Sequence, residues 1–135
     1  MKKYFHTKPL QRDLGLLLLR LMAGGGMIYA HGWGKMMRFI DGDHGFADVF
    51  GMGESVSLGL AVFGEAICSI FIVLGLFTRA ALIPAIITMA VAVFYIHGDD
   101  PFSKQEMGLL YLVPYVALFL TGPGKFSLDK IIFRS

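Results

Sequence analysis

The stretch VSLGLAVFGEAICSIFIVLGLF, residues 56–77, decides the fold, because it is almost entirely apolar and carries a single charged residue, Glu65. About 20 apolar residues are what an α-helix needs to cross the hydrocarbon core of a bilayer. The stretch therefore predicts a membrane span. A carboxylate near the middle of a span costs at least ~2.5 kcal/mol and rarely faces lipid. We therefore expect Glu65 to have a polar partner elsewhere in the chain.

The composition extends this interpretation to the whole molecule. Of 135 residues, 56% are hydrophobic and 16% are charged. A water-soluble domain of this length has too small an interior to bury so much apolar surface, so the predicted environment is a lipid bilayer. A net charge of +2 is too small to indicate a nucleic-acid partner. The lone cysteine, Cys68, excludes an internal disulfide and a dithiol redox pair.

Hydrophobic runs predict an all-α fold, an integral membrane four-helix bundle that forms one domain over residues 1–135. The N-terminal run is predicted to be a span and not a signal peptide, because Arg20 interrupts it. Ser103 and Glu106 have the S-x-x-E spacing of a capping box that starts the last span. The tail, residues 123–135, is basic and amphipathic and is expected on the membrane surface. The predicted spans are about 9–31, 56–77, 80–97 and 104–121.

The loop between the first two spans is predicted to contain a short amphipathic helix. Phe46, Val49 and Phe50 are spaced i, i+3, i+4, which places them on one helical face that can lie on a membrane surface. This helix could act as a lid over the outer end of the bundle or as a simple interfacial anchor.

The distribution of Lys and Arg predicts the orientation, because cytoplasmic loops carry an excess of them. The outer side would hold only Lys35, Arg38 and Lys104. We therefore expect a multi-pass protein of the bacterial inner membrane with both termini in the cytoplasm. The cations predicted on the cytoplasmic side are Lys2, Lys3, Lys8, Arg12, Arg79, Lys125, Lys130 and Arg134.

A second charge, Arg20, is predicted to be the partner of Glu65. If the first helix begins near Pro9, Arg20 lies about 16 Å along it, and Glu65 lies about 13 Å from the outer end of its own span. The two side chains would then meet inside the bundle. Such a pair could fix the helix register only, or it could bind a polar head group or pass protons.

Further polar residues extend this candidate site. On a 3.6-residue period His31 and Lys35 share the helix face of Arg20. Arg20, Glu65 and His31 are the first candidates for a quinone or proton site, and Lys35, His97 and Glu106 are second candidates.

None of these side chains is a redox centre, so electron transfer would need a bound cofactor. A lipid-soluble quinone fits best, because it could enter between the helices and accept hydrogen bonds from His or Arg. Haem held by His31 and His97, or a metal held by these two and Glu106, is less consistent with the sequence. Histidines at span ends more often meet water, and the capping box already accounts for Glu106. No metal site is predicted.

Several short motifs follow one another from about Leu14 to Asp129. They are R-L-x-x-G (Arg20, Leu21, Gly24), H-G-x-x-K (His31, Gly32, Lys35), Glu65, G-L-F-T-R (75–79), His97, Glu106 and T-G-P-G-x-x-S-L-D (121–129). Their order and spacing resemble the DoxX family of small four-span membrane proteins. The resemblance implies a bacterial inner-membrane bundle that is described as an oxidoreductase component. DoxD-like relatives are assigned as the membrane subunit of a thiosulfate:quinone oxidoreductase.

Three functional hypotheses follow. In the first, the chain is the membrane subunit of a quinone-linked oxidoreductase, is not catalytic alone, and works with a soluble or membrane partner. In the second, it is a non-catalytic scaffold or assembly factor that stabilises a partner protein or a second copy of itself. In the third, it is a small proton-coupled carrier that uses the buried charges.

Overall fold

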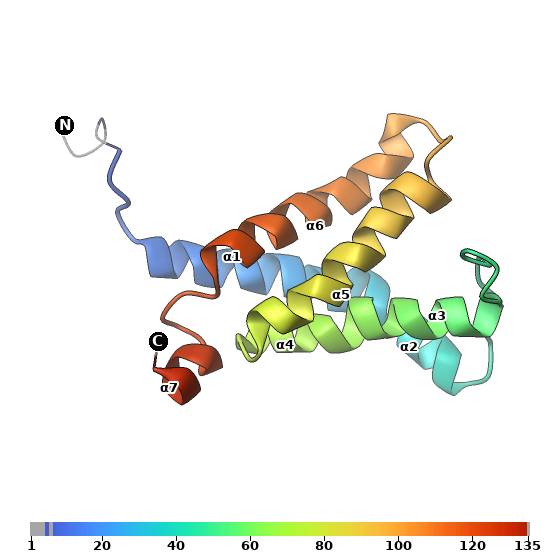
Figure 1. Cartoon of the computed structure of the whole chain (residues 1–135), viewed down its shortest axis with the longest axis horizontal. Coiled ribbons are helices and arrows are strands. Elements are labelled where there is room, and N and C mark those ends of the chain that lie inside the picture. The colour runs from blue at the N-terminus through green and yellow to red at the C-terminus, as the bar shows by residue number, and fades with distance from the viewer. Residues whose placement is uncertain (1–4, 6, 135) are drawn as a thin grey trace.

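The computed structural model describes residue 5 and residues 7–134, and Figure 1 shows an arrangement of helices with no strand in that part of the chain. Lys2 and Lys3, which the charge count placed in the cytoplasm, lie outside the described residues. The helices are α1 (Arg12–Met27), π-helix η2 (Ile28–Gly32), α2 (Trp33–Ile40), α3 (Glu54–Val62), π-helix η3 (Phe63–Ile67), α4 (Cys68–Leu74), α5 (Thr78–Ala90), π-helix η4 (Val91–Ile96), α6 (Phe102–Thr121) and α7 (Leu128–Phe133).

Several of these elements join end to end into long helices. Among the described residues, three long helices are apolar enough to cross a membrane: Arg12–Ile40, Glu54–Leu74 and Thr78–Ile96. Each contains one π-helix. The helix α6 has 20 residues and packs against α5.

The start of α1 and the helix α7 lie at one end of the bundle (Figure 1), which we call the terminal end, and the loop of residues 41–53 lies at the other, the loop end. The helices α1 and α4 pack together, and α5 and α6 cross them at an angle (Figure 1). The core between the four helices is apolar and includes Met27, Ile72, Leu82, Tyr115 and Leu118. Many large apolar side chains are exposed outside it, as expected of a surface that contacts lipid.

The first long helix differs from the prediction at both ends. It begins at Arg12, not near Pro9, and it continues past residue 31 to Ile40 as one helix of 29 residues. A π-helix at Ile28–Gly32 connects its two halves without breaking it. The consequence is that Lys35 belongs to the helix and that Arg20 lies nearer to its start than predicted.

The predicted amphipathic helix in the outer loop was wrong, because residues 43–49 are not helical. The side chain of Ser57 accepts the Val49 N–H at 3.0 Å, and Asp48 accepts the Gly53 N–H at 2.8 Å. In a helix these N–H groups would donate to backbone carbonyls, whereas here they donate to side chains. Of the residues in the apolar i, i+3, i+4 pattern, Val49 is buried, whereas Phe50 is exposed and lies against Tyr95.

The predicted capping box at the start of α6 was also wrong. The helix begins at Phe102, its N-cap is Pro101, and no side chain caps it. Ser103 is therefore already inside the first turn, and Glu106 is exposed.

The tail is folded back onto the terminal end of the bundle. Ser127 is the N-cap of α7, and its hydroxyl accepts the Lys130 N–H at 3.3 Å. Gly75 ends α4 in the left-handed region, with a φ of +68°, and its carbonyl accepts the Asp129 N–H at 2.8 Å. The tail, described up to residue 134, is thus joined to the α4–α5 turn.

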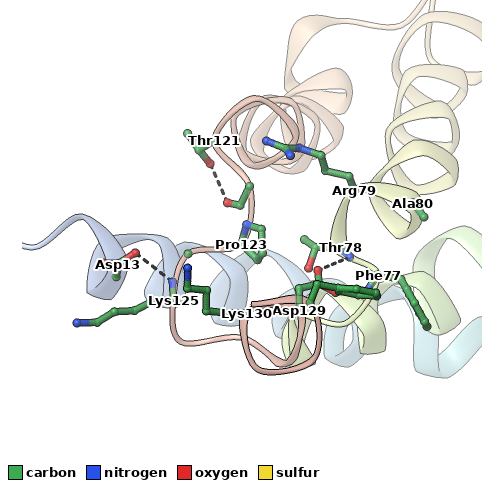
Figure 2. Close-up of a pocket in the computed structure, with 13 residues that line it drawn as sticks. Asp13, Phe77, Thr78, Arg79, Ala80, Thr121, Pro123, Lys125, Asp129 and Lys130 are labelled. Carbon is green, nitrogen blue, oxygen red and sulfur yellow. Dashed lines mark hydrogen bonds between the residues drawn. The ribbon is translucent and has the colours of Figure 1, made fainter. Parts of the chain in front are cut away.

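Replacing Asp129 with alanine is expected to lower the free energy of unfolding by about 1.5 kcal/mol, within the range measured for lost helix caps. Its carboxylate accepts the N–H groups of Phe77 and Thr78 at 2.7 and 2.9 Å, and so caps α5 from α7 (Figure 2). Thermal unfolding in detergent measures the loss. Asp129→Asn keeps one acceptor oxygen and should lose about half as much; equal losses for both variants would show that the carboxylate does not act as the cap.

Candidate functional site

Glu65 has a charged partner, but the partner is Lys35. The carboxylate is 3% exposed, and both of its oxygens lie 2.7 Å from the Lys35 ammonium nitrogen. The Lys35 side chain is 26% exposed. The carboxylate of the ion pair is therefore buried, whereas its lysine side reaches the surface. A buried carboxylate needs such a partner to remain charged in a low-dielectric interior.

The predicted Arg20–Glu65 pair was therefore wrong. Arg20 is fully buried at the terminal end, where its guanidinium donates to the carbonyl of Phe126. A Cβ on Gly75 would overlap this guanidinium, so Arg20 lies at the level of the α4–α5 turn. Ten residues of helix, about 15 Å, separate that level from Glu65. The late start of the first helix accounts for about 4.5 Å of this distance. The prediction failed mainly because the helix continues to Ile40, so that Lys35 and not Arg20 reaches the level of Glu65.

The residues of the site come from segments of unusual helix geometry. His31 lies in the π-helix η2, Glu65 lies in η3, and His97 directly follows η4. π-Helices are rare and occur frequently at functional sites, because the wider turn moves a side chain to a position that an α-helix would not give it.

Gly32 allows η2 and η3 to approach each other. A Cβ at this position would lie 2.6 Å from the Glu65 carbonyl oxygen and 2.9 Å from the Ala66 Cα. Only glycine fits between the two backbones. The H-G-x-x-K motif thus places His31 and Lys35 on either side of a contact point that faces Glu65.

A cavity of about 170 Å³, which we call the polar cavity, lies between the long helices at this level. His31 packs edge-on against Tyr111, with ring centroids 5.6 Å apart. The His31 Nε2 atom is buried and has no hydrogen-bond partner in the described part of the chain. The polar residues lining this cavity are His31, Lys35, Glu65, His97, Lys104 and Tyr111.

The rim of the polar cavity lies at the loop end. His97 Nδ1 is 2.7 Å from an Asp100 carboxylate oxygen, and both side chains are more than a third exposed. Gln105 fixes this corner by donating to the His97 carbonyl at 2.8 Å. The cavity therefore ends at a solvated His and carboxylate pair, which can exchange protons with water.

On its other side the Lys35–Glu65 pair faces a second cavity of about 180 Å³, which we call the apolar groove. Lys35, Glu65 and Ala92 line both cavities. The groove lies between α3 and α5, and Leu60 and Ile87 on its lining are more than half exposed. It therefore opens to the side of the bundle.

The loop of residues 41–53 covers the end of the apolar groove. The Lys35 nitrogen lies 5.6 Å from the centre of the Phe46 ring, a cation–π distance. The Phe50 N–H donates to the Tyr95 hydroxyl at 3.3 Å, and the two rings are 4.3 Å apart. Side chains of the loop thus touch both Lys35 and η4.

The start of this loop is held by polar contacts. Asp43 accepts the Gly45 N–H at 3.3 Å and pairs with Arg38, and these interactions hold the pKa of the Asp43 carboxyl below its usual value. His44 stacks on Phe39 with ring centroids 4.5 Å apart, and its Nδ1 lies 3.0 Å from the Ser55 hydroxyl.

Of the six predicted site residues, the structure brings four together around the polar cavity: His31, Lys35, Glu65 and His97. Arg20 lies at the opposite end, and Glu106 lines a separate surface groove on α6. Lys104 and Tyr111 were missed. Their i, i+7 spacing is the only signal for them, and it does not specify which helix face meets the cavity. No three His, Cys, Asp or Glu side chains in the described part of the chain are grouped to hold a metal.

Comparison with known proteins gives two matches. The family model of DoxX matches residues 15–98. An uncharacterized protein of Haemophilus influenzae is 30% identical over 133 residues, which cover 91% of this chain and 94% of that protein. No solved structure matches the chain.

Proposed function

Because this chain belongs to the DoxX family of membrane proteins, we propose that it binds a lipid-soluble quinone beside Lys35 as the membrane subunit of a quinone-linked oxidoreductase. One observation supports this most. The buried Lys35–Glu65 pair stands between an apolar groove that opens sideways and a polar cavity that ends at solvated groups.

The residues present fit a quinone head group. Small-molecule sites are mostly apolar and have a few polar groups that fix the orientation of the ligand. The groove supplies the apolar walls, and the Lys35 ammonium supplies a donor for a carbonyl oxygen. The unpartnered His31 Nε2 lies in the polar cavity on the other side of the ion pair. A bound quinone would supply the two-electron chemistry that no side chain of this chain provides.

The protein groups then have distinct roles in this proposal. Glu65 holds the Lys35 side chain in place, because both of its carboxylate oxygens lie 2.7 Å from the ammonium nitrogen. His31 can hold or release a proton at Nε2, and the polar cavity connects it to His97 at the solvated rim. Electrons would come from a soluble or membrane partner, which completes the enzyme.

The proposal includes a four-span topology in the bacterial inner membrane with both termini in the cytoplasm. The 20-residue helix α6 is long enough to cross as the fourth span, and only residues 97–101 connect it to η4. The terminal end carries Arg12, Arg79, Lys125 and Lys130, which favours the cytoplasm for that end.

Mass spectrometry of lipids extracted from the gently solubilised full chain tests the quinone. We expect near-stoichiometric quinone in the native protein and at least a tenfold loss in a Lys35→Met, Glu65→Leu double variant. That variant removes both charges, so it leaves no stranded ion and is expected to fold. An Asp13→Leu, Lys125→Met variant removes the same two charge types at the terminal end and should keep the quinone.

Bulk phospholipid alone in the native protein, or equal quinone in both double variants, would overturn the proposal. A native protein without quinone that still captures a specific partner would instead favour a scaffold.

A further inference from the structure

A cavity of about 830 Å³ lies at the terminal end and is unrelated to the quinone proposal (Figure 2). We call it the terminal pocket. It is formed where the α4–α5 turn, the end of α6 and the folded-back tail meet the start of α1. None of the residues proposed to hold a quinone lines it.

The terminal pocket has an excess of positive charge on its wall. Three cations and two carboxylates line it: Arg79, Lys125, Lys130, Asp13 and Asp129. Both carboxylates already accept backbone N–H groups, Asp13 at 3.0 Å from the Lys125 nitrogen and Asp129 at 2.7 and 2.9 Å from its two donors. Their charge is thus partly compensated by the fold, which leaves a site suited to an anion.

Two polar side chains at the pocket wall, Arg79 and Thr78, have hydrogen-bonding atoms without a partner in the described part of the chain. Arg79 donates from Nε to the Phe119 carbonyl at 2.9 Å, which fixes the guanidinium between α5 and the end of α6 (Figure 2). Its Nη1 and Nη2 atoms make no hydrogen bond to the described residues. Beside it, the Thr78 hydroxyl is buried without a hydrogen-bond partner in the same part of the chain. A guanidinium fork and a hydroxyl are typical donors to phosphate oxygens.

The surroundings of the pocket favour a lipid over a soluble anion. Phe77 and Phe133 line it with ring centroids 6.0 Å apart, and both are about half exposed. Ile131 and Ile132 on α7 are also exposed. An apolar surface beside a cluster of cations at the end of a membrane bundle matches the boundary between acyl chains and anionic headgroups.

We propose that the terminal pocket binds the phosphate-bearing headgroup of an anionic phospholipid, with Arg79 and Lys130 as its cationic ligands and Phe77 and Phe133 against the acyl chains. The lipid comes from the leaflet that the terminal end contacts. Since α5, α6 and the tail all contribute to the pocket, a bound headgroup would hold the tail against the bundle.

Native mass spectrometry of the full chain in detergent tests this proposal. Phosphatidylglycerol and phosphatidylcholine are supplied at equal concentration, and retention of each is counted. We expect the native protein to retain phosphatidylglycerol preferentially. An Arg79→Gln, Lys130→Gln variant should lose this preference, by about fivefold for each cation removed.

The matched control is Lys8→Gln, Arg12→Gln, which removes two cations of the same end that do not line the pocket. It should retain the native preference; an equal loss in both double variants would overturn the proposal, because general surface charge would then explain the binding. A third arm adds free sn-glycerol 3-phosphate to the native protein. If it displaces the lipid fully at equal concentration, the site binds a soluble anion and the lipid assignment is wrong. If the pocket variant fails to fold, Lys130→Gln alone and the glycerol-phosphate arm decide the outcome by the same criteria.

Discussion

Replacing Lys35 with methionine is expected to lower the free energy of unfolding by about 3 kcal/mol, because it leaves a buried carboxylate without a cation. The Glu65 side chain is only 4% exposed, whereas that of Lys35 is 26% exposed. The reverse change, Glu65→Leu, leaves an ammonium that water can reach, and should cost only about 1 kcal/mol. Denaturant unfolding in detergent measures both variants and their double-variant combination.

The double variant Lys35→Met, Glu65→Leu should be more stable than Lys35→Met alone, because it removes the stranded charge. Arg38→Met serves as the control, since its partner Asp43 is exposed and such surface pairs contribute about 0.5 kcal/mol. Equal, small losses for Lys35→Met and Glu65→Leu would show that water already solvates the pair.

Replacing Gly32 with alanine is expected to cost about 3 kcal/mol, at the upper end of overpacking penalties. The new Cβ would meet the Glu65 carbonyl carbon at 2.7 Å and the Ala66 Cα at 2.9 Å, and backbone atoms of a packed helix cannot move aside as a side chain can. The helices would separate at the level of the ion pair. Thermal unfolding measures the loss, and the extracted quinone should fall with it.

Gly34 provides the matched control in the same helix. A Cβ there has nothing within 4 Å, so Gly34→Ala should raise stability by about 0.5 kcal/mol through the better helix propensity of alanine. A Gly32→Ala protein as stable as the native one would show that η2 and η3 are not in close contact.

The sequence predicted the helices well where apolar runs end at glycine or proline. The helix expected at 80–97 lies at Thr78–Ile96, and the helix expected at 104–121 lies at Phe102–Thr121. It also predicted that Glu65 needs a charged partner. The free-energy cost of burying a carboxylate is a property of the side chain itself and does not require knowledge of the fold. Which cation supplies the charge depends on how far each helix extends, and the sequence did not show that the first helix runs on to Ile40.

The helix-face argument failed for a related reason. Residues spaced at 3.6 per turn share a face only along a continuous α-helix. The π-helix η2 interrupts that period between Arg20 and Lys35. His31 and Lys35 lie near Glu65, and Arg20 does not. Tyr111 and Lys104 were missed because their place in the site depends on the way α6 packs across the bundle, and the sequence of α6 is apolar on most sides.

The contact between Arg20 and the tail has a consequence for the biosynthesis of the chain. The carbonyl that accepts from this buried guanidinium belongs to Phe126, 106 residues later. At about 5 to 20 residues per second, a ribosome needs about 5 to 20 s to make that acceptor after Arg20 has been made. During this time the first span holds an unsatisfied cation in or beside the membrane. This hydrogen bond can therefore form only after residue 126 has been made, and a chain that terminates earlier would leave the Arg20 guanidinium without this acceptor.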